Sequence, residues 1–177
     1  NPHPIPTAIE AMARLYDTND PSIIRSAIYD FLTRSKPRIT GHFGGAIAPS
    51  SDPVSKLKEI TAAIKNLNSS YLAIQGPPGA GKSHTGKHVI AELLKTGAKV
   101  GIASNSHKAI NNLLLGTARH CREQGISANF MTSKDTEPDL EALGVTFVKS
   151  SQIADDLVNA LHKNISECSK LQSRNEV

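Results

Sequence analysis

Residues 76–83 constrain the fold of this chain more than any other segment. They read Gly-Pro-Pro-Gly-Ala-Gly-Lys-Ser and match the pattern G-x-x-x-x-G-K-[ST], which is typical of a phosphate-binding loop. An apolar run at 71–75 precedes them, and apolar residues at helical spacing follow them within 89–94. The alternative is an ordinary glycine-rich turn that binds no ligand, and such a turn could match the pattern without a strand before it and a helix after it. Because a phosphate-binding loop lies between a strand and a helix, the flanks favour a ligand-binding loop.

The residue types in this loop suit the phosphates of a nucleotide. Glycine has no Cβ atom, so the backbone of Gly76, Gly79 and Gly81 can turn its N–H groups toward a phosphate. Lys82 brings an ammonium to the β- and γ-phosphates, Ser83 brings a hydroxyl to Mg²⁺, and the following helix directs the positive end of its dipole at the anion. We therefore predict a nucleotide site in which Ser83 is a metal ligand. The predicted binding residues are Gly76, Pro77, Pro78, Gly79, Ala80, Gly81, Lys82, Ser83, His84 and Thr85.

The composition narrows the remaining possibilities. The chain has 177 residues, enough for one domain with a helical appendage, and its formal charge of +4 permits a polyanionic partner without indicating one. Cys121 and Cys168 lack C-x-x-C spacing, so we expect free thiols in a reducing cytoplasm and no zinc or disulfide framework. Since no apolar run reaches the roughly 18 residues that span a bilayer, we expect no membrane partner.

The spacing of apolar and helix-breaking residues divides the chain into three segments. Residues 1–35 carry apolar stripes that predict two helices, one capped by Thr7 and one from Pro21 through Leu32. Residues 36–52 are rich in Gly, Pro and Ser and predict an irregular connector. A cap followed by proline at Asp52 and Pro53 then predicts a helix, which opens a nucleotide-binding domain over 53–177.

Strands and helices are predicted to alternate in this domain. The predicted strands are 71–75, 98–103, 128–132 and 145–149. The predicted helices follow the phosphate loop, run from 104 to 125, lie near 138–143 and start again at Gln152. Alternation of this kind predicts an α/β fold, a parallel sheet with helices on both faces that is preceded by N-terminal helices. The phosphate loop then lies at the carboxyl end of its strand, where such sheets bind ligands.

A second group of polar residues follows the predicted strand 98–103. It consists of Ser104, Asn105, Ser106, His107 and Lys108. These residue types at the start of a helix can hold the phosphates or sugars of a nucleic-acid backbone. Serine and asparagine can equally cap the helix while the lysine is solvated. The residue types alone leave both interpretations open.

Residues 74–83 together with 100–108 resemble motifs I and Ia of superfamily 1 helicases. The likeness is to the branch of nonsense-decay and Okazaki-fragment helicases, and within it to bacterial proteins that join a RecB-like nuclease to a helicase. The resemblance covers about 37–115. It implies the first RecA-like motor domain, with ATP and Mg²⁺ as cofactors, Lys82 and Ser83 as catalytic residues, and 104–108 touching single-stranded nucleic acid, either DNA or RNA. ATP hydrolysis would drive translocation or unwinding, with the remainder of the helicase chain as partner.

Two departures from this family pattern limit what the resemblance implies. A helicase of this kind needs an Asp-Glu pair after an apolar strand, and here Asp155-Asp156 lies in a helix-period segment instead. The adenine-reading Leu-Asn-x-x-Gln pattern begins at Leu67 but lacks its Gln. We therefore expect an incomplete motor domain that lacks motif II, and that binds ATP but hydrolyses it negligibly.

Other interpretations of the phosphate loop remain. A small-molecule kinase would use the same loop to deliver phosphate to an acceptor, and a nucleotide-binding module would use it without catalysis. A GTPase is disfavoured because the Asn-Lys-x-Asp guanine signature is missing. His84 and His88 are four residues apart, which is a metal-ligand spacing, but no Glu or third ligand accompanies them, so we predict no metal site there.

Overall fold

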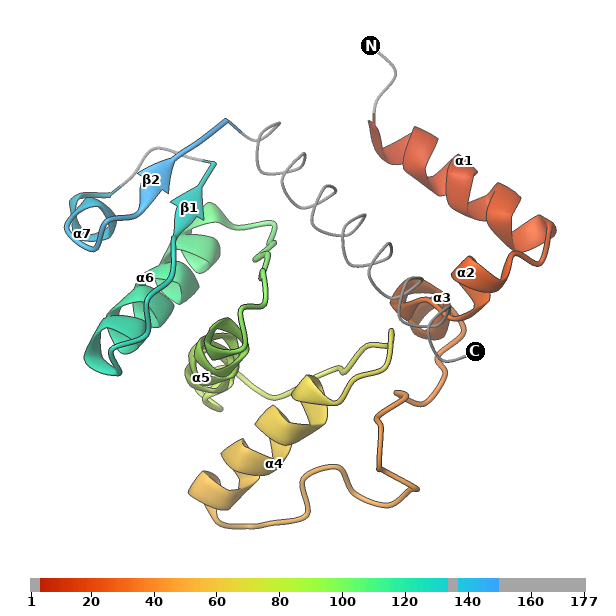
Figure 1. The fold of residues 1–177 in the computed structure, drawn as a ribbon, viewed down its shortest axis with the longest axis horizontal. Helices are drawn as coiled ribbons and strands as arrows, with labels where there is room; N and C mark the ends of the chain where they lie inside the picture. Colours follow the sequence, from red (N-terminus) through yellow and green to blue (C-terminus); the bar gives the residue numbers. More distant parts are fainter. Residues whose placement is uncertain (1–3, 134–136, 150–177) are drawn as a thin grey trace, which may run out of the picture. The chain divides into compact units, whose positions relative to one another are not determined.

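The computed structural model of the chain describes residues 4–133 and 137–149 (Figure 1). It divides into two compact units, Asn1–Pro78 and Gly79–Val177. The boundary between them falls inside the phosphate loop, after Pro78. The division proposed from the sequence, with boundaries after residues 35 and 52, remains a prediction.

The first unit contains four helices among its described residues. They are α1 (Pro4–Asp17), α2 (Pro21–Ile24), α3 (Ala27–Leu32) and α4 (Pro53–Lys65). The predicted helix from Pro21 through Leu32 is broken in two, because Ser26 takes an extended conformation and its hydroxyl accepts the Tyr29 N–H at 3.2 Å, which caps a new helix. The predicted start of α4 is confirmed, since the Asp52 carboxylate accepts the Ser55 N–H at 2.8 Å.

The connector between α3 and α4 is irregular, as predicted, but it is tied to the chain that follows α4. Ile39 forms an isolated antiparallel bridge with Leu67. The N–H of Thr40 donates to the carbonyl of Asn66 at 2.9 Å, and the N–H of Asn68 donates to the carbonyl of Arg38 at the same distance. The connector therefore runs beside residues 66–68.

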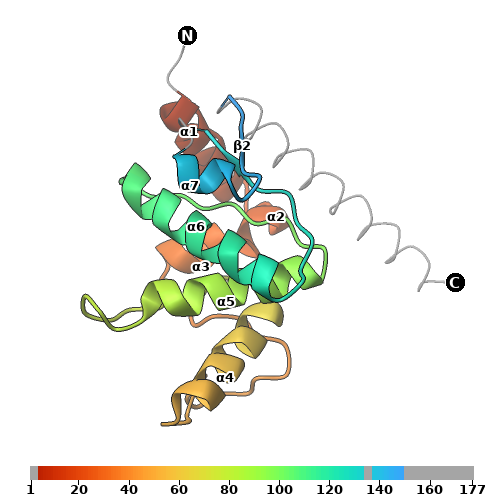
Figure 2. The same cartoon turned by 90° about the vertical axis from the view of Figure 1, so that its left-hand side faces the viewer.

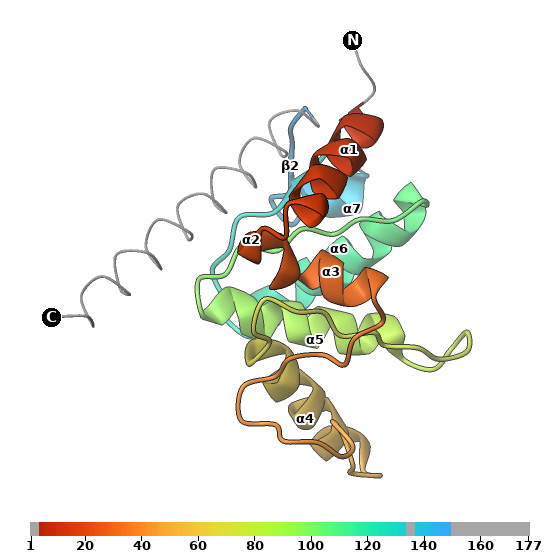
Figure 3. The same cartoon turned by 90° about the vertical axis from the view of Figure 1, so that its right-hand side faces the viewer.

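The second unit is built on two long helices, α5 (Lys82–Lys95) and α6 (His107–Glu123). They pack side by side and begin at the same end of the unit, as Figures 2 and 3 show from opposite sides. The helices approach closely at Gly86, where an added Cβ would lie 3.4 Å from a methyl of Leu113. The two segments expected to bind ligands, 79–85 and 104–108, thus lead into neighbouring helices.

Two short strands and one short helix complete the described part of this unit. They are β1 (Met131–Thr132), α7 (Pro138–Glu141) and β2 (Thr146–Phe147). The strands pair in parallel, with Met131 opposite Thr146 and Thr132 opposite Phe147, and α7 connects them. Leu114, Leu140 and Val145 form the buried core under this crossover. The predicted strands at 128–132 and 145–149 are confirmed, although each is shorter.

The other two predicted strands, 71–75 and 98–103, are irregular segments in the structure. Those predictions are wrong because an apolar run forms a strand only when a neighbouring segment pairs with its N–H and C=O groups. Among the described residues the only sheet has two strands, so the larger sheet covered by helices on both faces is not formed. The helix predicted from Gln152 lies outside the described residues, as do Asp155, Asp156 and Cys168. In the described part of the chain, no helix combines the length and the apolar character needed to cross a membrane.

Candidate functional site

The phosphate loop ends in a left-handed glycine at the start of α5. Gly79 has a φ of 80° and Gly81 a φ of 79°, a backbone conformation that side chains with a Cβ rarely adopt. The carbonyl of Gly81 accepts the N–H of Thr85 at 2.9 Å, which begins the helix. Gly81 is also the N-cap residue and has no side chain to cap the first turn. No side-chain hydrogen bond caps this turn, and the N–H groups at the start of a helix are a typical binding site for an anion.

An open hollow of about 260 Å³ lies at this end of α5. Its lining is formed by Gly79, Gly81, Lys82, Ser83 and His84. All five residues are exposed, and a Cβ added at either glycine would meet no atom within 4 Å. The hollow thus combines open space beside the loop with one ammonium group and one hydroxyl. These groups fit the phosphates of a nucleotide and its Mg²⁺.

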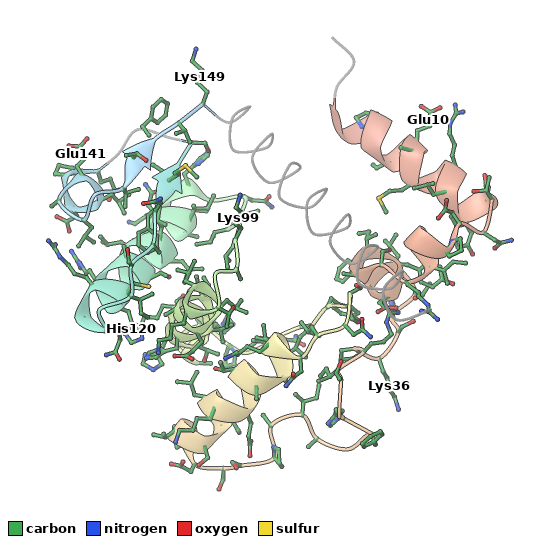
Figure 4. All side chains as sticks on the ribbon, in the orientation of Figure 1. Glu10, Lys36, Lys99, His120, Glu141 and Lys149 are labelled. Carbon is green, nitrogen blue, oxygen red and sulfur yellow. The ribbon has the colours of Figure 1, made fainter. Side chains whose placement is uncertain are left out.

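Three histidine rings form a row that starts at His84 in the lining of this hollow. The centroids of His84 and His88 on α5 are 4.3 Å apart, and those of His88 and His120 on α6 are 4.2 Å apart. Figure 4 labels His120, whose side chain lies where α6 meets α5. The ring Nδ1 of His88 lies 2.8 Å from the carbonyl oxygen of His84, and since a carbonyl only accepts, this nitrogen carries the proton. The described residues contain no group of His, Cys, Asp or Glu able to hold a metal ion.

The environment of His84 and of His120 favours uncharged imidazole. Partial burial, then His88 and Lys87, lower the pKa of His84 below its ordinary 6.5. Burial is also the main cause of the lowered pKa of His120, with His88 and Lys87 adding to it and Glu123 opposing it. Protonation of His84 or His120 is therefore disfavoured, in part by the positive charge of Lys87.

Residues 104–108 precede and begin α6. The hydroxyl of Ser106 accepts the Ala109 N–H at 3.4 Å and caps the helix, and the hydroxyl of Ser104 accepts the Ser106 N–H at 3.2 Å. All five residues, Ser104, Asn105, Ser106, His107 and Lys108, are exposed. The capping role left open by the sequence is therefore present for Ser106, whereas Ser104 holds the turn before the helix. Contact with nucleic acid remains a prediction.

A comparison with protein-family models matches residues 55–176 to the AAA domain family. The chain belongs to this family. The match covers more than half of the chain and includes α4, the phosphate loop and residues 104–108. The family is one of P-loop nucleoside triphosphatases (NTPases) of helicase superfamily 1, so the chain has a P-loop NTPase fold of the type found in ATPase and helicase motors. Searches of curated proteins and of solved structures found no match.

The AAA domain brings together only part of the predicted nucleotide site. The hollow collects Gly79, Gly81, Lys82, Ser83 and His84, whereas Ala80 and Thr85 are outside its lining. Gly76, Pro77 and Pro78 belong to the other compact unit. The roles of all these residues in nucleotide binding remain predictions.

Two features of the described chain escaped the sequence analysis. His120 joins His84 and His88 only because α6 packs on α5, and no local pattern marks it. Asp30 is buried, with 2% of its surface exposed, and contacts Arg38 and Ser70. The one available signal was an aspartate within the apolar stripe of a helix.

Proposed function

We propose that this AAA domain binds ATP with Mg²⁺ at residues 76–85 and serves a superfamily 1 helicase motor. The hollow at the start of α5, lined by Lys82 and Ser83 in a member of this family, carries the proposal. The motor couples ATP hydrolysis to translocation along, or unwinding of, nucleic acid. The resemblance of the two motifs favours the nonsense-decay and Okazaki-fragment branch.

The loop residues have distinct roles in this proposal. The left-handed glycines let backbone N–H groups face the phosphates, and the dipole of the 14-residue helix α5 adds positive potential at the same point. The ammonium of Lys82 offsets negative charge on the β- and γ-phosphates, and the hydroxyl of Ser83 holds the metal ion. Mg²⁺, when bound, supplies charge neutralisation across the two terminal phosphates.

Residues 104–108 are the proposed contact with single-stranded nucleic acid. Support comes from their exposure and from the packing of α6, which they begin, against α5 (Figures 2 and 3). The helix has no acidic residue in its first turn, so its N-terminus repels no phosphate through a carboxylate. Lys108 adds a cation there. A strand bound here would contact the helix that packs against α5.

Calorimetric titration with ATP and Mg²⁺ tests the nucleotide site. Lys82→Ala should weaken ATP binding by at least about tenfold, the effect of removing one charge-assisted contact. Lys99→Ala, which removes an exposed lysine of the same unit (Figure 4), should leave the affinity unchanged. Equal losses in both variants, or no ATP binding by the wild-type chain, would contradict the proposal.

Fluorescence anisotropy with a labelled single strand tests the second contact. Binding should weaken steadily as salt rises and should fall on Lys108→Ala, because phosphate contacts act by releasing counterions. Lys36→Ala, an exposed lysine of the other compact unit, is the control. A chain that ignores the strand and transfers phosphate to a small acceptor would instead be a kinase.

A further inference from the structure

A buried carboxylate joins three separate segments of the first unit. Asp30 on α3 has 2% of its surface exposed. One of its oxygens lies 2.6 Å from the guanidinium of Arg38, and the other accepts the hydroxyl of Ser70 at 2.6 Å. Arg38 belongs to the connector and Ser70 to the chain after α4. Three segments far apart in the sequence thus meet at a single side chain.

Arg38 extends this contact along the chain that leads to the phosphate loop. Its guanidinium also donates to the carbonyl of Ser69 at 2.9 Å. Its backbone N–H donates to the hydroxyl of Ser70 at 3.0 Å, and its carbonyl accepts the N–H of Asn68 at 2.9 Å. Ser70 therefore accepts one hydrogen bond and donates another, and residues 68–70 are held on both backbone and side chain.

Tyr71, the next residue after Ser70, is also attached to α3 and to the segment that follows it. Its hydroxyl donates to the carbonyl of Ser35 at 3.1 Å, and its ring meets that of Phe31 edge to face with 5.5 Å between centroids. Phe31 follows Asp30 on α3, so the same helix holds both Ser70 and Tyr71. Residues 72–75, which come next, form no ladder, and Gly76 opens the phosphate loop directly after them.

We propose that Asp30, Arg38 and Ser70 form a clamp that positions the chain entering the phosphate loop and thereby sets its affinity for nucleotide. The inference rests on the proposed ATP site. A buried carboxylate without its partners costs free energy, so one arrangement of the three side chains is strongly favoured. This arrangement fixes the position of Ser70, and with it the start of the segment that leads to the phosphate loop. A loop held in place loses less entropy when it closes on phosphates, and this favours binding. The clamp residues act on the loop only through the segment that links Ser70 to Gly76, so they are positioning residues.

Ser70→Ala removes the hydroxyl that bridges Asp30 and Arg38. The chain offers a matched control in Ser50→Ala, because the hydroxyl of Ser50 also donates to a carboxylate of the same unit, that of Glu59, at 2.6 Å. Both variants lose one charge-assisted hydrogen bond to a carboxylate. Only Ser70 lies in the clamp, and its replacement also removes the acceptor of the Arg38 N–H. Ser70→Thr keeps the hydroxyl and should behave as the wild type.

Two measurements on the full 177-residue chain separate positioning from stability. Amide hydrogen exchange without nucleotide should be about tenfold faster at Thr40 and Asn68, which keep their own acceptors, in Ser70→Ala than in Ser50→Ala. The ATP dissociation constant, measured where both variants are fully folded, should rise about tenfold in Ser70→Ala alone and return toward the wild-type value in Ser70→Thr.

Each outcome decides for or against the clamp. Faster exchange with weaker ATP binding in Ser70→Ala supports it, whereas equal exchange in both alanine variants, or equal ATP affinity, overturns it. If the wild-type chain binds no ATP, the proposed function fails, and backbone order parameters at 71–76 then decide, since a clamp requires them to fall in Ser70→Ala. Should Ser70→Ala not fold, Arg38→Lys, which keeps the charge but loses the contact with Ser69, takes its place under the same criteria.

Discussion

The ring of His88 on α5 lies 4.2 Å from the ring of His120 on α6, measured between centroids. This contact joins the helix that follows the phosphate loop to the helix that follows residues 104–108. Because the pKa values of His84 and His120 are lowered, first by burial and then by His88, the folded unit favours neutral rings here. The contact between the two helices is thus sensitive to protons.

The first prediction concerns stability at acid pH. A histidine whose pKa is lowered by folding binds fewer protons in the folded than in the unfolded chain, so stability is complete above the ordinary pKa of 6.5 and falls as the pH drops through and below it. Urea unfolding between pH 7.5 and 5.5 should show this loss. His120→Gln should flatten the dependence, whereas His107→Gln, exposed at the start of α6, should leave it unchanged. Identical slopes in all three chains would refute the prediction.

The second prediction compares two glycines of the same region. Gly81 has a φ of 79°, so Gly81→Ala forces a side chain into the left-handed region and should lower the free energy of unfolding by about 1–2 kcal/mol. Gly86 is helical, and its added Cβ would lie 3.4 Å from a movable methyl of Leu113. Gly86→Ala should therefore gain helix propensity and raise the free energy of unfolding by up to about 1 kcal/mol. Urea midpoints that move in the same direction for both variants would contradict this account.

Local signals in the sequence predicted the helices well and the sheet poorly. The cap and proline at Asp52 and Pro53, and the serine at Ser106, mark the starts of α4 and α6 because capping needs only residues within one turn. Residues 71–75 and 98–103 are as apolar as a strand should be, yet they remain irregular. Strand formation depends on a neighbouring segment, which no local pattern specifies.

The candidate site likewise combines features that a local sequence motif predicts with contacts that no local motif predicts. The left-handed glycines of the phosphate loop follow from a local motif, and the hollow collects Lys82 and Ser83 beside them. The partners of Asp30, by contrast, are 8 and 40 residues away in the sequence, and His120 meets His88 across two helices. Contacts of that kind depend on tertiary packing, so the sequence pattern indicated His84 and His88 but neither His120 nor the group around Asp30.

The third prediction concerns the small core under the β1–β2 crossover. Leu140 has no exposed surface and packs with Leu114 and Val145. Leu140→Ala leaves a cavity that the short helix α7 has little room to close, and should lower the free energy of unfolding by about 2–5 kcal/mol. Met131→Ala on the adjacent strand, where 42% of the side chain is already exposed, should cost less than about 1 kcal/mol. Comparable losses in denaturant unfolding would show that Leu140 is not central to this core.

The fourth prediction concerns the reactivity of Cys121. Its side chain on α6 is 1% exposed, and burial raises the pKa of the thiol, with Lys95 opposing the shift. The thiolate is the reacting form, so both low access and a high pKa should slow modification. In a Cys168→Ser chain, which leaves Cys121 as the single thiol, an aromatic disulfide reagent should react at the rate of transient unfolding and speed up in mild urea. A control chain carrying Lys99→Cys, Cys121→Ser and Cys168→Ser has its thiol at an exposed position and should react rapidly whatever the urea concentration. Equal rates for the two chains in the absence of urea would show that Cys121 is accessible in the folded unit and would contradict this prediction.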